Sequence, residues 1–321
     1  MAAMVTLGYF LSSEERDPRD LVDAAVRAEQ AGFGTAWISD HYHPWTDAQG
    51  QSAFVWSSIG AIAQATSSLR LWTAVTCPTV RIHPSVIAQA AATSAVLSEG
   101  RFGLGVGSGE ALNEHIFGDA WPNADVRLEM LEEAVAVIRK LFTGEQVSHR
   151  GRHYTVENAR LYTLPDTPPE IYVSAFGPKA VEVAARIGDG YMNVGPDGDL
   201  LAQYRAHGGR GRSHSGMKVA WAATQDEGVD NAFRLWPNDG LPGELTQLLP
   251  TPRHFEQASQ LVTRDMIADS VPAGPDPEVH LARIQQYVDA GYDEVYVAHI
   301  GPDQAGMIDF YAREIIPNLP G

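Results

Sequence analysis

The sequence predicts an α/β fold, a (β/α)8 TIM barrel with insertions, and three observations support this prediction. Apolar runs of strand length alternate eight times with longer segments of helical spacing. The 321 residues are enough for one such barrel. No long linker rich in Pro, Gly or Ser divides the chain. We therefore expect a single domain over residues 1–321. A doubly wound open sheet is the alternative, which eight regular units disfavour.

The first half of the chain supplies four of these units. Asp17-Pro18 is a typical helix start and Gly32 a typical stop, and Pro84 begins another helix in the same way. The predicted strands are Val5–Phe10, Thr35–Ile38, Leu69–Val75 and Arg101–Val106. The predicted helices are residues 18–31, 58–65, 84–97 and 126–142.

The second half supplies the other four strands, with two interruptions. Residues 143–169 are polar and contain several Gly and Pro, which predicts an excursion outside the barrel, for which a hairpin is one form. Residues 225–275 contain no clean strand pattern and predict a helical lid insertion. The predicted strands are Ile171–Ser174, Gly190–Val194, Val219–Ala223 and Glu294–Ala298, and the predicted helices are residues 178–187, 277–290 and 304–316.

Composition excludes several classes of function. A formal charge of −17 argues against nucleic acids and anionic membranes as partners, although it leaves small anionic ligands open. No apolar run approaches transmembrane length, and Met1–Val5 shows no secretion signal. The single cysteine, Cys77, allows no internal disulfide, which is typical of a reducing compartment. We expect a cytoplasmic protein that acts on small molecules.

The most informative stretch, Ser39–Trp45, follows the second predicted strand. His41 beside Asp40 offers a proton-accepting imidazole next to a carboxylate, at the barrel end where chemistry is usually built. Capping of the next turn is the alternative. His43 is interpreted as a surface residue, and Trp45 either packs in the core or walls a planar ligand. Metal binding by Asp40, His41 and His43 is disfavoured because further ligands are not apparent, so no metal is expected.

A second cluster, Gly105–Glu114, follows the fourth strand. Its glycines are spaced by two and lack the third position of a dinucleotide fingerprint, which disfavours a Rossmann phosphate loop. Glycines such as Gly107 instead let the backbone approach a flat ligand. Glu110 is then the acid at the strand end, and Asn113 a nearby donor and acceptor. A helix N-terminus that carries Glu110 because of its dipole is the alternative.

Weaker signals lie at other strand ends. Phe176-Gly177-Pro178-Lys179 joins a strand to a helix and could bind an anion through free amides and Lys179. Cys77 is interpreted as a packing residue, since no base stands beside it. Three later residues are interpreted as packing unless the pocket includes them: Trp221, Trp236 and His299.

Together, Ser39-Asp40-His41 with Trp45, the Gly105–Glu114 motif and Ala120-Trp121-Pro122 resemble the F420-dependent glucose-6-phosphate dehydrogenases of the luciferase-like superfamily, over nearly the whole chain. The resemblance implies a (β/α)8 barrel, a homodimer, the deazaflavin cofactor F420 and catalysis by His41, Glu110 and Trp45. It also implies a non-proline cis peptide at Ala74–Val75. The cofactor-binding residues that it implies are Asp40, Ala74, Val75, Cys77, Gly107, Asn113, Phe176, Gly177 and Lys179, and the expected substrate-binding residues are Val194, Trp221 and Trp236.

One departure from that family concerns the substrate. The family binds the sugar phosphate with two lysines and an arginine. The corresponding places here are Val194–Asp199, the surroundings of Thr246, and Asp269–Val271, none of them basic. Because charged donors dominate phosphate recognition, glucose 6-phosphate is not the expected substrate. Arg253 or Arg264 would compensate only if the lid were rearranged.

The expected reaction is therefore hydride transfer between an alcohol or sugar carbinol carbon and C5 of F420, in either direction. The alternatives are an FMN-dependent luciferase-like monooxygenase and a non-catalytic barrel that binds a flavin or deazaflavin. A zinc-dependent hydrolase is a more distant one.

Overall fold

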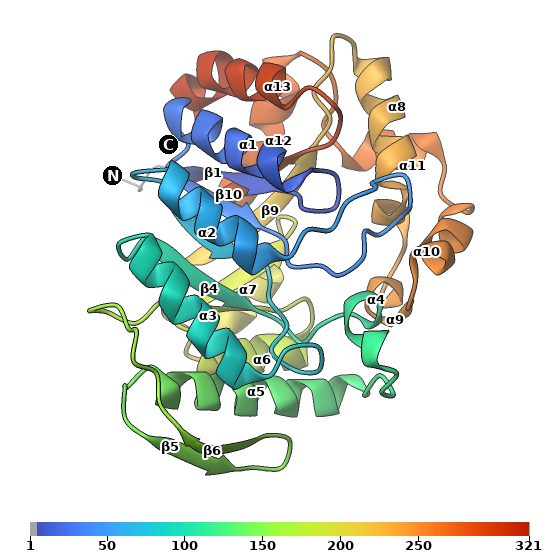
Figure 1. Cartoon of the computed structure of the whole chain (residues 1–321). Helices are drawn as coiled ribbons and strands as arrows, with labels where there is room; N and C mark the ends of the chain where they lie inside the picture. The colour runs from blue at the N-terminus through green and yellow to red at the C-terminus, as the bar shows by residue number, and fades with distance from the viewer. Residues whose placement is uncertain (1–4, 321) are drawn as a thin grey trace.

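The computed structural model describes residues 5–320, and in it eight parallel strands close into a barrel (Figure 1). Residues 1–4, which bear on the secretion-signal prediction, lie outside this range. The ring order is β1-β10-β9-β8-β7-β4-β3-β2. The predicted (β/α)8 barrel is thus confirmed. Its strands are β1 (Thr6–Leu11), β2 (Thr35–Ile38), β3 (Arg70–Thr73), β4 (Phe102–Val106), β7 (Ile171–Ser174), β8 (Gly190–Val194), β9 (Ser213–Val219) and β10 (Glu294–His299).

Helices surround this ring, and most begin at the predicted signals. Asp17 accepts a hydrogen bond from the Arg19 amide at the start of α1, and Pro84 occupies the first turn of α3. Among the described residues, no helix is long and apolar enough to cross a membrane. The surrounding helices are α1 (Pro18–Gln30), α2 (Val55–Ala65), α3 (Pro84–Leu97), α5 (Ala124–Leu141), α6 (Pro178–Ile187), α7 (Gly198–Ala206), α12 (Pro277–Asp289) and α13 (Gln304–Phe310).

The seventh strand is the one strand that the sequence misplaces. The prediction was Val219–Ala223, whereas β9 ends at Val219. The earlier residues look polar because His214 and Gly216 face the barrel interior, where His214 contacts aromatic rings and Gly216 leaves room for Trp37. Ala220 instead bridges to Ala273 and belongs to a separate apolar cluster. Helix α7 was also not predicted, although the Asp197 side chain caps it.

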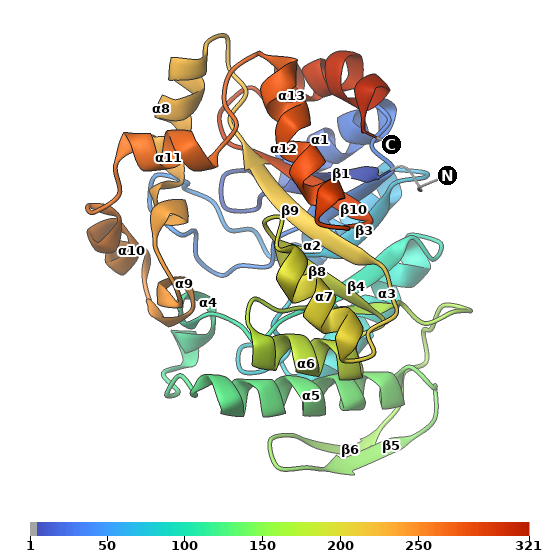
Figure 2. The ribbon, with the colours of Figure 1, turned by 180° about the vertical axis from the view of Figure 1, so that it is seen from behind.

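Both irregular stretches have structure of their own. Within residues 143–169, β5 (Val147–Arg150) and β6 (Thr155–Ala159) form an antiparallel hairpin beside α5 (Figures 1 and 2). Residues 225–275, called the insertion below, fold into helices that lie on the side of the barrel near α4 (Ala111–Glu114). They are α8 (Gln225–Leu235), η2 (Pro237–Gly240), α9 (Leu245–Leu248), α10 (Pro252–Ser259) and α11 (Arg264–Ser270).

Large side chains fill the interior of the barrel. Trp37 stacks on Tyr296 with ring centroids 4.2 Å apart, and Trp72 packs against Tyr172. Small neighbours make this packing fit: a Cβ on Gly103 would lie 2.1 Å from the Trp72 ring. A filled barrel has no central pore, so a ligand site must lie at one of its ends.

His299, the last residue of β10, makes the stability of the fold depend on pH. It is 2% exposed, and burial, assisted by the charge of Arg16, lowers its pKa to about 3. An unfolded histidine has a pKa of about 6.5, so between these values the unfolded chain binds a proton that the folded chain excludes. Stability is therefore present above pH ~6.5 and decreases as the pH falls toward 3.

We expect His299→Gln to flatten the decrease in unfolding free energy between pH 6 and pH 4, measured by urea denaturation. One such histidine changes the unfolding free energy by at most about 1.4 kcal/mol per pH unit. Burial also lowers the pKa of His214 and His280, so part of the slope should remain. The exposed His207→Gln is the surface control. Identical slopes in wild type and His299→Gln would contradict this account.

Candidate active site

The imidazole of His41 lies between two carboxylates at the C-terminal end of the barrel. Its Nδ1 is 3.4 Å from Glu14 Oε1, and its Nε2 is 3.5 Å from Glu110 Oε2. Glu14, His41 and Glu110 follow β1, β2 and β4 respectively, and parallel strands end at the same edge. The structure thus brings together His41 and Glu110, which are 69 positions apart in sequence.

Glu14 is a site residue that sequence reasoning missed. Its side chain is almost fully buried, and Oε2 accepts hydrogen bonds from Ser12 Oγ at 2.9 Å and Ser39 Oγ at 2.8 Å. These donors fix the carboxylate on the Nδ1 side of His41. The available signal was an acid directly after the first strand, the same signal that drew attention to Asp40 after the second.

Glu110 stays protonated more readily than an ordinary glutamate. Desolvation raises its pKa, which the nearby Glu14 charge raises further, although His41 and the Asn113 hydrogen bond act in the opposite direction. Asn113 Nδ2 donates to Glu110 Oε2 at 3.0 Å, while Asn113 Oδ1 accepts from the amides of Tyr42 and His43. Asn113 therefore holds the Glu110 loop against the His41 loop.

The carboxylate of Asp40 is held by protein donors. It accepts from Thr76 Oγ1 at 2.7 Å and from the Arg81 guanidinium at 2.7 Å, and it is 4% exposed. Arg81 also donates its main-chain N–H to Glu114 Oε2 at 2.6 Å. Arg81 and Glu114 were not predicted as part of the site. Asp40 was predicted as a cofactor contact, and its contacts in the structure are with these neighbouring loops.

Trp45 packs between His41 and the insertion, and its contact with a planar ligand stays a prediction. Its ring centroid lies 4.9 Å from that of His41, and on another side 5.1 Å from that of Phe255 in α10. It therefore packs against the insertion and also walls the site. His43 has a structural role: its Nδ1 is 2.9 Å from the Leu112 carbonyl oxygen, and its ring stacks on His115.

The two later tryptophans occupy different places. Trp236 Nε1 donates to Glu15, the neighbour of Glu14, and the ring lies under Lys218. Trp221 packs against Phe310 and Gly306 of α13, so the structure places it in the helical layer and gives no support to a substrate contact. Among the predicted substrate residues, Val194 is the most accessible, 57% exposed at the end of β8.

A cis peptide after β3 and a glycine after β4 pack closely against each other. The Ala74–Val75 peptide is cis, as the resemblance implies. A Cβ on Gly107 would lie 2.7 Å from Val75 Cγ2, so only glycine fits there. Cys77 is buried, its Sγ 2.8 Å from Thr79 Oγ1, and burial raises its pKa, which argues against a nucleophilic thiolate.

The start of α6 offers main-chain donors. Among the described residues no side chain caps this helix, and a Cβ on its N-cap residue Gly177 would meet nothing within 4 Å. Phe176 is 51% exposed. Lys179 is exposed too, and its Nζ lies 2.7 Å from Asp125 Oδ1. Open amides at a helix N-terminus are typical of an anion site.

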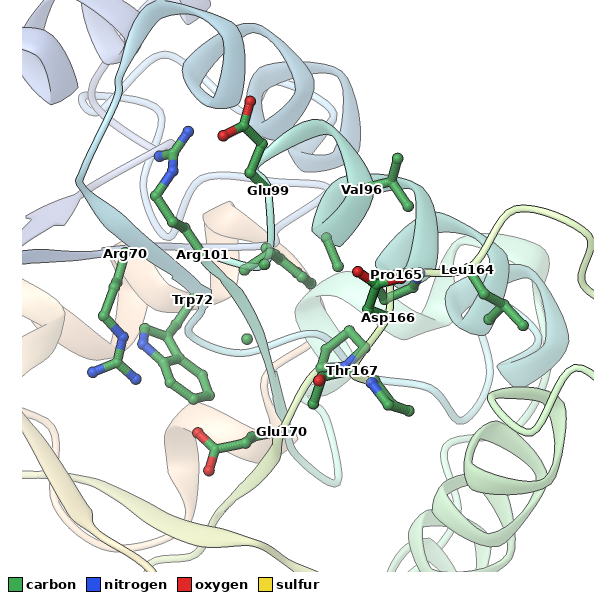
Figure 3. Close-up of a pocket in the computed structure, with 16 residues that line it drawn as sticks. Arg70, Trp72, Val96, Glu99, Arg101, Leu164, Pro165, Asp166, Thr167 and Glu170 are labelled. Atoms are coloured by element: carbon green, nitrogen blue, oxygen red, sulfur yellow. The ribbon is translucent and has the colours of Figure 1, made fainter.

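A cavity at the other end of the barrel contains none of these residues. It has a volume of about 720 Å³ and is lined by Arg70, Trp72, Glu99 and Glu170 among others (Figure 3). Arg101 at its edge donates to the Leu69, Ala63 and Thr66 carbonyls, a structural role. This end of a barrel usually serves stability. Within residues 5–320, no group of His, Cys, Asp and Glu could hold a metal ion.

The sequence and fold are similar to known proteins over their full length. The sequence profile of a family described as luciferase-like monooxygenase matches residues 2–294. The F420-dependent glucose-6-phosphate dehydrogenase of Beutenbergia cavernae is 35% identical, over 98% of each chain. The F420-dependent hydroxymycolic acid dehydrogenase of Mycobacterium tuberculosis is 36% identical, over 98% of this chain and 88% of that one.

Solved structures agree with this relationship. An F420-dependent secondary alcohol dehydrogenase in complex with an F420–acetone adduct superposes with a TM-score of 0.92 at 31% identity, covering 99% of this chain and 100% of that one. A coenzyme F420-dependent tetrahydromethanopterin reductase from Methanopyrus kandleri, at 20% identity and a TM-score of 0.80, shares the fold over 99% of this chain and 100% of that one. The chain therefore belongs to the luciferase-like monooxygenase family, and within it to the F420-dependent dehydrogenases.

Proposed function

We propose that this protein is an F420-dependent oxidoreductase that acts on the CH–OH group of an uncharged alcohol or sugar, or on the corresponding ketone in reverse. The observation that carries the proposal is the imidazole of His41 held between Glu14 and Glu110 at the barrel mouth. The activities named for the relatives above support the same class of reaction.

The residues present fit a deazaflavin. Gly107 and the cis Ala74–Val75 peptide offer a flat backing for a planar ring, and Asn113 lies between the two loops that would flank it. The uncapped start of α6 would hold an anionic tail through its amides. When bound, the deazaflavin supplies a hydride acceptor at C5 for the carbinol carbon, and in reverse a hydride donor.

The protein's own groups handle the proton. His41 takes the hydroxyl proton as general base while the carbinol carbon is oxidised, and the Glu14 carboxylate on the Nδ1 side stabilises the resulting imidazolium. Glu110, whose pKa is raised by burial, holds a proton that it passes toward the ring-facing side of the site. Trp45 packs against His41 and keeps water from one side of it.

An uncharged substrate is proposed because the regions that correspond to the phosphate site are not basic. The loop after β8, Val194–Asp199, contains no Lys or Arg, and Asp197 in it caps α7. Arg264 is paired with Asp226 at 2.9 Å and with Asp230 at 2.7 Å, so it is not available without breaking those pairs. A phosphate dianion would therefore not find Arg264 as a free charged donor.

The direct test mixes pure protein with F420 and a panel of alcohols, sugars and sugar phosphates, and follows loss of the oxidised deazaflavin's visible absorbance. We expect turnover of uncharged alcohols or sugars and none of glucose 6-phosphate. His41→Ala should lower kcat by about 10²–10⁴-fold and keep F420 binding, measured by fluorescence titration. Strong glucose 6-phosphate activity would refute the substrate proposal. Copurified FMN with oxygen consumption would indicate a monooxygenase, and F420 binding without any turnover a non-catalytic barrel.

Glu14 is proposed as a positioning residue for His41. We expect Glu14→Gln to lower kcat by about 10²-fold with a smaller change in KM. F420 binding, measured by fluorescence titration, and the melting temperature should stay close to those of wild type, because the change acts on the orientation of His41. The exposed Glu145→Gln makes the same charge change far from the site and is the control. A reduced kcat accompanied by an equal loss of folded protein would mean that Glu14 acts only in folding.

We also propose that two copies associate through α2 and α3. These adjacent helices contain no charged residue in a chain with a formal charge of −17, so like copies can approach there without repulsion. Between them lies an exposed apolar groove of about 280 Å³, lined by Phe54, Trp56, Gly60, Ile82, Val86, Gln89, Ala90, Thr93, Ser94 and Leu97.

A cytoplasmic location stays a prediction from the single cysteine.

The dimer proposal is tested by sedimentation velocity. Wild type should sediment as a dimer, and Val86→Glu, which places a charge in the groove, should shift it to monomer. Val279→Glu changes another exposed valine, on α12, and should leave the dimer intact. A wild-type monomer, or dimers of Val86→Glu as stable as the control, would exclude this interface.

A further inference from the structure

Three of the basic side chains around the site are paired with a carboxylate. Arg81 is paired with Asp40 and Glu114, and Arg16 lies 3.4 Å from Glu15. The third pair is Lys218 with Asp239, and it differs from the others because its acid comes from the insertion.

Lys218 has an unusual position for a lysine in this chain. Only three lysines occur, and the other two lie on the outer helices α5 and α6. His214 and Gly216 of β9 face the interior, so the two-residue alternation of a strand directs Lys218 inward as well, near the C-terminal end where the site lies. Its side chain is 28% exposed.

Two groups of the insertion cover this ammonium. Asp239 Oδ1 lies 2.8 Å from Lys218 Nζ, and the Trp236 ring centroid lies 4.2 Å from the same atom. Trp236 in turn donates to Glu15, next to Glu14, which contacts His41. The covered lysine is therefore connected to the catalytic group through one short series of contacts.

We propose that Asp239 determines substrate charge: by neutralising Lys218, it keeps the mouth selective for uncharged alcohols and excludes those that carry a phosphate or carboxylate. The proposal rests on the proposed function. An inward ammonium without its partner would be a ready ligand for an anionic group. With Asp239 in place, such a substrate finds Lys218 already paired and meets Glu14, Glu15 and Glu110. Specificity of this kind depends on what the site refuses as well as on what it binds.

The experiment compares wild type with Asp239→Asn, which keeps the side-chain shape and removes the charge. We expect the ratio of kcat/KM for an anionic alcohol to that for a neutral alcohol to rise at least 10-fold, with 3-hydroxybutyrate and glucose 6-phosphate as anionic substrates and 2-butanol as the neutral one. Asp230→Asn makes the same charge change on α8, where its partner is Arg264, and should leave the ratio unchanged. Equal ratios in wild type and Asp239→Asn would overturn the proposal.

A second readout needs no turnover. Titration calorimetry with inorganic phosphate should detect an additional binding site in Asp239→Asn that wild type lacks, whereas binding at the start of α6 is common to both proteins. Adding Lys218→Met to Asp239→Asn should abolish the additional site. An additional site that survives Lys218→Met would place the anion elsewhere and overturn the proposal. Asp239→Ser repeats the test if the asparagine variant does not fold. Lysine-dependent phosphate binding in a protein without F420 turnover would refute the proposed function alone.

Discussion

The buried guanidinium of Arg81 joins three loops on which the site depends. It lies 2.7 Å from the Asp40 carboxylate in the loop after β2. Arg81 itself belongs to the loop after β3, and its main-chain N–H donates to Glu114, which follows β4 in the sequence. All three side chains are nearly inaccessible to water. Removing one partner from such a cluster leaves an uncompensated charge, which typically costs about 3–5 kcal/mol. His41 follows Asp40 directly, and Glu110 lies one helical turn before Glu114. The Arg81 cluster therefore sets the distance between His41 and Glu110.

The filled barrel interior decides where that cluster can act. Four aromatic side chains fill the space enclosed by the strands: Trp37, Trp72, Tyr172 and Tyr296. The reacting groups are therefore carried on loops over a rigid floor. The insertion adds a second apolar cluster above this floor, built around Trp236 and Val262. In the proposed mechanism, the loops at the barrel end carry the proton transfer and the insertion selects the substrate.

Most of the fold follows from sequence because strand runs and helix starts are local signals. β9 does not, since His214 and Gly216 look polar until neighbouring strands supply the aromatic rings that they face. The meeting of His41 with Glu110 could be predicted because parallel strands end at one edge. Arg81 could not, because its pairing with Asp40 joins two irregular loops whose course no periodicity describes. Trp221 and Trp236 look alike in sequence, and only the packing of α13 separates them.

Trp45 contacts the His41 imidazole on one side and α10 of the insertion on the other. The insertion proposed to select the substrate is thus in direct contact, through Trp45, with the group proposed to accept the proton. Exchange of insertions between relatives would transfer substrate preference and would also change the packing of Trp45 against His41. Variation in this enzyme family would then be expected to alter turnover and selectivity jointly, and a grafted insertion would need a matching residue at position 45.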